Sequence, residues 1–383
     1  MSKKNPLRFL VAPNTLKGSI NAVEAAEALR KGIERGVPGA IVVEQPIADG
    51  GELTTEILVR AMGGVFKEAI VRDPLGREVK AKYGLVDDGK TGVLELAAAS
   101  GMRLLKRDEL NPMRTSTFGT GQLISAILDQ GCKRIILGLG NSATVDAGTG
   151  ILKALGIRLT ERNKSAIPLG GSYLHTIVNI DMAELDIRIH DTEIVVLCDV
   201  ENTLLGKEGA AHVFAPQKGA TGEQVQLLEE NMEHFSKKSK ALFGFDLPSI
   251  KHGGAAGGVA ATLAAYLNAK LVHGTNYLLE VTGTPAKIQE ADFVFTAEGR
   301  LDEQTLKGKG PHGLAQLAKD YKKPVICFTG SLLPGFTPDT FPLFHAIISL
   351  PNRPMTLHES MHHAAELLEY QAMQAARLLN AGR

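Results

Sequence analysis

Six short apolar runs, each ending in a polar cluster, constrain the fold of this 383-residue chain more than any other feature. The runs are rich in Val, Ile, Leu and Phe, as buried parallel strands are, and most lead into a helical pattern. The polar residues that follow them are therefore expected at strand carboxyl ends, the edge at which open α/β sheets bind ligands. The runs are residues 7–12, 41–47, 134–139, 193–200, 292–295 and 324–328.

Composition and charge favour a small ligand. The 42 basic and 42 acidic side chains give a formal charge of zero, so electrostatics give no reason to expect nucleic acid or a membrane as a partner. No segment has the roughly 18 consecutive apolar residues of a membrane helix. The N-terminal apolar stretch is soon broken by Pro13, Asn14 and Lys17, unlike a secretory signal. Three widely spaced cysteines indicate reduced thiols and a cytoplasmic location.

The order of predicted elements indicates two α/β domains. The chain begins β-α-β-α, with a capping box at Asn21 and Glu24 and a helix that ends near Gly36. From residue 65 to residue 96, apolar and polar residues alternate instead. This pattern predicts two or three antiparallel strands with turns at 74–76 and 88–89. Further helices are predicted near residues 121–130, 148–155, 223–243, 258–268 and 357–379. We predict one α/β domain from residues 1–63 and 288–383, with a second, mixed-sheet α/β domain of residues 64–287 inserted into it.

Two glycine motifs match known signatures but lack the required context. Residues 84–91 have Walker A spacing, yet a strand-like segment follows Thr91 where a phosphate loop needs a helix, so a solvated hairpin turn is expected. Residues 138–143 fit the dinucleotide fingerprint after a strand. The nearest acidic partner, Glu161, lies in a turn-like segment, which argues against nicotinamide binding.

Three strand ends carry groups suited to phosphoryl transfer, which needs cations or amides, carboxylates for Mg²⁺ and a group that receives the attacking hydroxyl. Lys17 precedes a helix and could meet an anion, or it is simply a solvated lysine. Asp49 and Glu52 flank two glycines at a helix start, where an acidic N-cap is the alternative. Asp199 ends an apolar strand. It could act as a metal ligand or a general base there, or it could be a buried acid bonded to loop amides.

Three other clusters could bind anions. Residues 141–148 form a hydroxyl and amide loop that contains Ser142, with Asp146 able to cap the next helix. The small residues from Gly253 to Gly258 open a helix and would let backbone amides approach a nucleotide phosphate, or let helix and sheet pack closely. Glu298 and Arg300, with Lys307 and Lys309 further on, form either an anion clamp or a surface ion-pair network.

Read in order, these motifs resemble the bacterial glycerate kinase family, whose members phosphorylate D-glycerate with ATP. The resemblance covers nearly the whole chain and includes VAPNTLKGS, PIADGGE, RDPLGREVKA, LELAAASG, GTGQLI, GNSATVDAG, CDVENTLLG, GAAHVFAPQKGA, GGAAGG, TAEGRLDEQTLKGKGP and CFTGSL. It implies two α/β domains, one of them flavodoxin-like. Five positions depart from the family pattern: Asn14 replaces a frequent Asp, and Leu53, Asn141, Ala147 and Ala297 replace glycines.

The resemblance implies an ATP- and Mg²⁺-dependent kinase that makes 2-phosphoglycerate from D-glycerate. Asp199 would accept the hydroxyl proton or hold Mg²⁺, Asp49 would be a second metal ligand, and Lys17 would offset charge on the transferring phosphoryl group. Asn141, Ser142, Glu298 and Arg300 would bind the glycerate, and Gly253, Gly254, Gly257 and Gly258 the ATP phosphates.

Other functions stay open on sequence alone. A related hydroxy acid could be the substrate, or 3-phosphoglycerate the product; an NAD-dependent oxidoreductase and a catalytically silent metabolite-binding protein are further alternatives. The oligomeric state is undetermined and could be a homodimer. The strand ends at Lys17, Asp49, Glu298 and Gly330 are expected in one sheet, and those at Ser142 and Asp199 in the other. The active site is therefore expected in a cleft between the domains.

Overall fold

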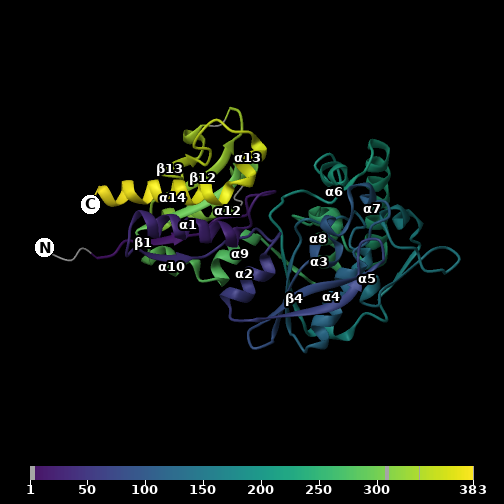
Figure 1. Ribbon diagram of the computed structural model, residues 1–383. Helices are drawn as coiled ribbons and strands as arrows, with labels where there is room; N and C mark the ends of the chain where they lie inside the picture. The colour runs from purple at the N-terminus through teal and green to yellow at the C-terminus, as the bar shows by residue number, and fades with distance from the viewer. Residues whose placement is uncertain (1–4, 307–309, 336, 383) are drawn as a thin grey trace. The chain divides into compact units, whose positions relative to one another are not determined.

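The structure is a computed structural model that describes residues 5–306, 310–335 and 337–382 (Figure 1). It contains two compact units, which we call the five-stranded unit and the six-stranded unit after their main sheets. The five-stranded unit combines Met1–Ala48 with Thr275–Arg383, and the six-stranded unit is Asp49–Gly274. No helix in the described ranges has the length and apolar character needed to cross a membrane.

The five-stranded unit contains a wholly parallel sheet. Its strands lie in the order β13-β12-β11-β1-β2, so that numbering only these strands along the chain gives the flavodoxin-like order 2-1-3-4-5. The strand order reverses between β1 and β11, the position at which such sheets bind ligands. The strands are β1 (Arg8–Val11), β2 (Ile41–Glu44), β11 (Phe293–Leu301), β12 (Val325–Leu332) and β13 (Ala346–Ser349).

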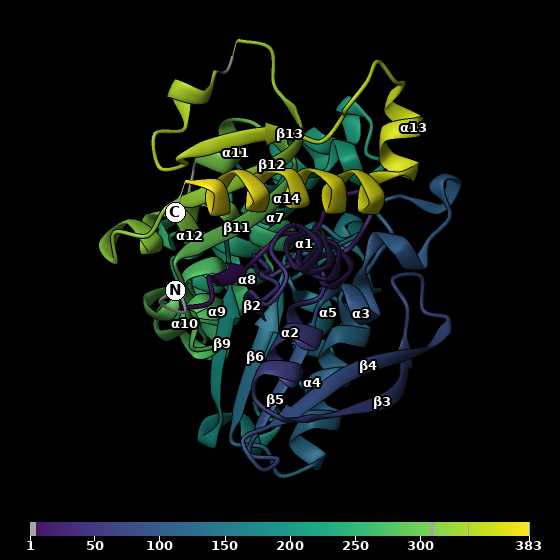
Figure 2. The ribbon, with the colours of Figure 1, turned by 60° about the vertical axis from the view of Figure 1, so that its left-hand side comes forward.

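Helices cover both faces of this sheet because successive strand residues point to opposite sides. Phe9 and Val11 pack in one core cluster with residues of α1 and α14, whereas Leu10 and Ala12 pack in another with residues of α10 and α12. Helix α14 packs against α1, and Figures 1 and 2 show the two helices next to each other. The helices of this unit are α1 (Ala22–Gly36), α10 (Thr284–Glu290), α11 (Glu303–Leu306), α12 (Gly310–Asp320), α13 (Leu357–His362) and α14 (Ala364–Ala381), and α9 (Gly274–Val281) begins at the junction of the units.

The six-stranded unit contains a mixed sheet in the order β10-β9-β6-β5-β4-β3 (Figure 2). The alternating segment forms β3, β4 and β5, paired antiparallel as predicted, and β5 then pairs parallel with β6. The Walker-like segment is the hairpin turn between β4 and β5, also as predicted. The strands are β3 (Val65–Arg72), β4 (Glu78–Val86), β5 (Thr91–Glu95), β6 (Arg134–Gly138), β9 (Glu193–Leu197) and β10 (Lys270–Val272), with a separate antiparallel pair β7 (Arg158–Thr160) and β8 (Asn179–Asp181).

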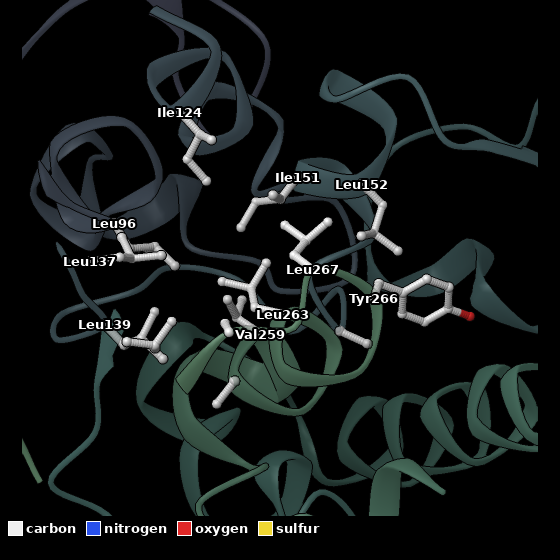
Figure 3. Packing of buried hydrophobic residues seen from close by; sticks show 14 of the residues in the cluster. Leu96, Ile124, Leu137, Leu139, Ile151, Leu152, Val259, Leu263, Tyr266 and Leu267 are labelled. Carbon is white, nitrogen blue, oxygen red and sulfur yellow. The ribbon is translucent and has the colours of Figure 1, made fainter. Parts of the chain in front are cut away.

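Helices α2 and α4 lie on opposite faces of the mixed sheet. A Cβ atom at Gly84 would meet Val59 of α2, whereas one at the neighbouring pair position Gly92 would meet Ile127 of α4. Figure 3 shows labelled side chains from β6 and from α4, α5 and α8 gathered in the core of this unit. The helices are α2 (Thr54–Ala61), α3 (Ala97–Ser100), α4 (Phe118–Asp129), α5 (Thr149–Ala154), α6 (Ala210–Phe214), α7 (Gly222–Phe243) and α8 (Ala255–Tyr266).

All six apolar runs contain strands, and the capping box of Asn21 and Glu24 is present, as predicted. The expected C-terminal helix is instead two, α13 and α14, separated at His363. The predicted domain boundaries after residues 63 and 287 lie further along the chain than the boundaries of the compact units. The difference at the first boundary arises because α2 packs on β4 and β5 of the six-stranded unit.

Candidate active site

Three polar segments meet at the carboxyl end of the parallel strands in the six-stranded unit, and glycines allow their backbones to touch. A Cβ atom at Gly50 would lie 2.9 Å from Leu197 Cβ, at the end of β9. A Cβ atom at Gly140 would lie 2.3 Å from Gly51 Cα, after β6. The segment of Asp49 therefore packs directly on the ends of the strands that lead to Ser142 and Asp199.

This packing corrects the expected grouping of the strand ends. Asp49 follows β2 of the five-stranded sheet in sequence, so it was expected to act with Lys17 and Glu298. The chain leaves that sheet after Glu44, and Asp49 belongs to the same compact unit as Ser142 and Asp199. The helix start also differs, because α2 begins at Thr54 with Leu53 as its N-cap, and neither Asp49 nor Glu52 caps it.

Asp199 has a nearly buried carboxylate held at the helix N-terminus of α9. Its side chain is 5% exposed, and its Oδ1 accepts a 2.6 Å hydrogen bond from the Gly274 amide. His273 Nδ1 lies 3.1 Å from the same oxygen. Gly274 also lies close to the backbone of Asp49, because a Cβ atom at Gly274 would lie 2.8 Å from the Asp49 carbonyl oxygen. Gly274 thus contacts the backbone of Asp49 and the carboxylate of Asp199, two predicted site residues.

The loop after β6 presents Asn141 and Ser142 in different environments. Asn141 is exposed and has a positive φ of 59°, and Ser142 is only 5% exposed. Ser142 Oγ accepts a 2.7 Å hydrogen bond from Lys218 Nζ. Lys218 was not recognised in the sequence, although it lies in the quoted GAAHVFAPQKGA motif. Its signal was a lysine among small and apolar residues, a context in which burial is unusual and informative.

Asp146 is a wholly buried anchor of this loop. Its carboxylate accepts hydrogen bonds from the amides of Thr117, Gly148 and Gly150, at 2.8, 3.1 and 3.3 Å. It also accepts the hydroxyls of Ser116 and Thr117, at 3.3 and 2.9 Å. Burial raises the pKa of this carboxyl, and the hydrogen bonds oppose that rise. Asp146 therefore ties the Ser142 loop to the start of α4 and to α5, in addition to its predicted role beside the next helix.

The predicted nucleotide loop is closely packed. Gly253, Gly254, Gly257 and Gly258 are all buried. The Gly253 and Gly254 amides donate to Ile250 O and Asn202 O, at 3.1 and 2.9 Å. A Cβ atom at Gly257 would lie 2.2 Å from Thr144 O, so close backbone approach already explains that glycine. The role of these glycines in binding ATP stays a prediction.

The dinucleotide fingerprint has a packing explanation as well. A Cβ atom at Gly138 would lie 2.5 Å from Gly50 O, and Gly140 contacts Gly51 as described above. The next helix, α5, begins only at Thr149. The two glycines thus make room for the segment of Asp49, where a pyrophosphate would otherwise have to lie.

A pocket of about 250 Å³ adjoins this site within the six-stranded unit, and Asn141, Glu95, Thr55 and Arg103 are among its lining residues. Burial raises the pKa of the Glu95 carboxyl to about 7, and the Thr55 amide donates to it at 3.0 Å. Arg103 forms an ion pair with Glu52 at the pocket. Glu95 was not singled out in the sequence, although it lies in the quoted LELAAASG motif, because it ends the apolar strand β5 and has no polar cluster around it.

The predicted residues of the five-stranded unit lie beside the reversal of strand order. Lys17 is exposed in the turn between β1 and α1, and a Cβ atom at Gly299 would lie 3.4 Å from its amide nitrogen. Glu298 accepts a 2.9 Å hydrogen bond from Thr305 Oγ1. Arg300 is exposed, and its Nη2 lies 3.3 Å from Asp302 Oδ2. Lys307 and Lys309 lie outside the described residues.

Glu298 and Arg300 do not follow a strand, as was expected, but lie within it. β11 continues to Leu301 because β12 pairs with it as far as Leu332, whereas β1 pairs only with residues up to Phe295. Glu298 and Arg300 thus project beyond the end of β1 on the same face of the strand. Gly330, also expected at a strand end, lies within β12 for the same reason.

Three of the four departures from family glycines have left-handed backbones. Leu53, Asn141 and Ala147 have φ values of 68°, 59° and 50°, a region that glycine adopts at little cost. Ala297, the fourth, lies buried in β11 with no positive φ. Leu53, Asn141 and Ala147 therefore hold a backbone conformation that a glycine would adopt at lower cost.

Comparisons with known proteins identify the family to which this chain belongs. Residues 9–380 match the model of the glycerate kinase family. A Halalkalibacterium halodurans protein named glycerate kinase is 43% identical over 96% of this chain and 97% of its own. An Escherichia coli protein named glycerate 2-kinase is 41% identical over 85% of this chain and 86% of its own.

The fold comparison extends over almost the whole length of both proteins. A crystal structure from Salmonella typhimurium LT2, described as a candidate glycerate kinase 2, aligns with a TM-score of 0.86 and 39% identity. It covers 99% of each chain. Family match, sequence identity and fold agree, and the chain belongs to the glycerate kinase family of enzymes.

Proposed function

We propose that this enzyme transfers the γ-phosphoryl group of ATP to D-glycerate and forms 2-phosphoglycerate, with Mg²⁺ bound. The observation that carries the proposal is the placement of Asp49, Ser142 and Asp199 at one sheet edge, where Gly274 lies against the Asp49 backbone and donates to the Asp199 carboxylate. Phosphoryl transfer depends mainly on positioning and on neutralising charge, and this edge offers carboxylates, a hydroxyl and amides together. The E. coli relative's name supports glycerate as substrate and the 2-position as acceptor.

Asp199 is the central residue of the proposed mechanism. The glycerate hydroxyl oxygen attacks the γ-phosphorus, its proton passes to a carboxylate, and ADP leaves. The hydrogen bond from the Gly274 amide keeps the Asp199 carboxylate oriented. Asp199 has two candidate roles here, as the proton acceptor and as a Mg²⁺ ligand.

The residues present fit Mg²⁺. No group of three or more His, Cys, Asp or Glu side chains suited to a metal occurs in the described ranges. Mg²⁺ sites in phosphotransferases, however, typically use one or two carboxylates together with substrate phosphates and water. Asp49 and Asp199 would supply those carboxylates, and the bound ion would neutralise phosphate charge.

The remaining residues would bind the two substrates. Ser142, Asn141, Glu298 and Arg300 would orient the glycerate, and Lys17 would offset charge on the γ-phosphoryl group. ATP would contact the glycine loop of residues 253–258. That the residues of both units act on one phosphoryl group and that the protein is cytoplasmic are predictions from the sequence alone, which left the oligomeric state open.

A coupled assay of ADP release tests the proposal directly. We expect ADP formation with D-glycerate and Mg²⁺, with less from related hydroxy acids, and NMR of the product should show the phosphate on carbon 2. A phosphate on carbon 3, or a better substrate among the other hydroxy acids, would replace the corresponding part of the proposal. Binding of glycerate or ATP without ADP formation would instead indicate a catalytically silent protein.

A further inference from the structure

Lys218 is the one lysine among the largest fully buried side chains of the described residues, and it does not belong to the proposed mechanism above. It ends a short 3-10 helix, η5 (Pro216–Lys218), and is 2% exposed. Gly219 follows with a φ of 95°, and a Cβ atom there would lie 2.2 Å from Leu110 O. The turn after Lys218 is therefore fixed by packing, which directs the side chain inward.

The ammonium group is held at the loop that presents Ser142. Lys218 Nζ donates to Ser142 Oγ and to the Thr144 carbonyl oxygen, both at 2.7 Å. In its charged form a lysine ammonium has three donors and no acceptor, so the serine oxygen is then the acceptor in this bond. The Ser142 hydroxyl hydrogen is left to donate elsewhere, and within the described ranges Ser142 makes no second side-chain hydrogen bond.

The position of this lysine is costly for folding alone. Burial lowers the pKa of Lys218 to about 7, and the charge of Asp146 opposes that effect. An apolar side chain of similar volume would usually be at least as stabilising in such a place. Strongly perturbed groups of this kind cluster at functional sites. A role in presenting Ser142 accounts for the retention of the charge.

We propose that Lys218 is a positioning residue, which fixes the Ser142 oxygen so that the serine hydroxyl donates to an anionic oxygen of the substrate, namely the carboxylate of the hydroxy acid. This inference rests on the proposed function. The same chemistry would suit a nucleotide phosphate, so the kinetic test includes both substrates. The carboxylate is favoured because Ser142 follows Asn141, which lines the adjoining 250 Å³ pocket, a volume that suits a small acid.

Two single variants and their combination test the contact. Lys218→Met removes the charge and keeps most of the stem, and Ser142→Ala removes the hydroxyl. A hydrogen bond to a charged group contributes about 10- to 100-fold in affinity, so each variant should raise the KM for glycerate by about that factor. The KM for ATP should change less than about threefold, since uniform loss of glycerate binding leaves the other steps intact.

The double variant distinguishes positioning from separate roles. Because Lys218 acts through Ser142, the combined variant should raise the glycerate KM no more than about the larger single effect. Multiplied effects would overturn the proposal. Lys153→Met is the matched control. Lys153 is partly buried and, like Lys218, donates to a backbone carbonyl, in this case that of Ile167. It makes no hydrogen bond with Ser142. Its glycerate KM should stay at the wild-type value.

The remaining outcomes also decide. A purely structural role would lower kcat through loss of folded enzyme and leave both KM values unchanged, and a selective rise in the KM for ATP would move the contact to the nucleotide; either overturns the proposal. If Lys218→Met does not fold, the Ser142→Ala variant alone tests the proposal. An unchanged KM for glycerate in Ser142→Ala would then refute the proposed positioning role. A wild-type enzyme that forms no ADP with glycerate would instead refute the proposed function.

Discussion

The two units present their strand ends in contrasting ways. In the six-stranded unit, the Asp199 carboxylate, Ser142 and Lys218 are nearly or fully buried, and each has a defined hydrogen bond. In the five-stranded unit, Lys17 and Arg300 are exposed. Charged groups in a dry, fixed environment interact far more strongly than groups in water. The candidate site residues of the six-stranded unit are therefore more preorganised than those of the five-stranded unit.

This contrast orders the expected effects of substitution. Buried groups that are already oriented should carry the chemistry, and their loss should reduce kcat most. Exposed groups on the five-stranded unit lose conformational freedom when they bind, so each should contribute less. The following predictions test this order, beginning with the largest effect.

Asp199→Asn should lower kcat by about three orders of magnitude or more, because it removes either the proton acceptor or a metal ligand while the Gly274 contact remains available. Steady-state ADP release at saturating glycerate and ATP measures the effect. Glu193→Gln, at the exposed other end of β9, is the matched control and should keep nearly full activity. A decrease under about tenfold for Asp199→Asn would refute both roles and remove the basis of the contrast.

Lys17→Met should lower kcat by a smaller factor, about 10- to 100-fold, because an exposed cation stabilises transition-state charge less strongly than a buried one. Lys31→Met, on the exposed surface of α1, is the control and should have no effect. The assay should be repeated at raised ionic strength, which should reduce the difference between wild type and variant. A loss as large as that of Asp199→Asn would contradict the contrast between the units.

The sequence predicted the strands well because burial on both faces leaves a long apolar run, as in residues 193–197. It also predicted that the polar segments follow the strands of each sheet, and whether these segments carry the chemistry stays a prediction. It could not predict that Asp49 leaves the sheet of its own strand, because nothing local records that Gly50 and Gly51 pack on Leu197 and Gly140.

Individual contacts were harder still to predict. The bond between Lys218 and Ser142 joins residues 76 positions apart, and no periodicity links them. The extension of β11 past Phe295 depends on its pairing with β12, and the sequence there, with Glu298 and Arg300, looks like a loop. Long-range packing decides such cases, and it overrides local pattern.

The charge on Lys218 should give a pH-dependent stability difference. Its folded pKa lies near 7, below the value of 10.5 for a free lysine, so the unfolded chain binds more protons between these values and stability rises with pH. The free energy of unfolding of the wild type should rise relative to Lys218→Met by up to about 1.4 kcal/mol per pH unit above pH 7. Urea unfolding at pH 7, 8 and 9 measures it.

A matched control separates this effect from general alkaline changes. Lys237→Met replaces an exposed lysine on α7 of the same unit with the same side chain. A difference between wild type and Lys218→Met that stays constant from pH 7 to 9 would show that Lys218 is not desolvated. The contrast between the buried residues of the six-stranded unit and the exposed residues of the five-stranded unit would then be weaker than the structure indicates.

The smallest effect concerns the strained backbone at the entrance to α2. Leu53 has a φ of 68°, which costs a side-chain-bearing residue about 1–2 kcal/mol relative to glycine. Glycine loses more entropy on folding, and the partly buried leucine contacts are lost, so Leu53→Gly should stabilise the protein by only about 0.5 kcal/mol. Met62→Gly, at the other end of α2 with a φ of −102°, should destabilise it, because no strain is relieved there. The urea midpoints of both variants measure these stability changes. A loss of stability in Leu53→Gly would show that the leucine contacts stabilise the protein by more than the left-handed backbone destabilises it.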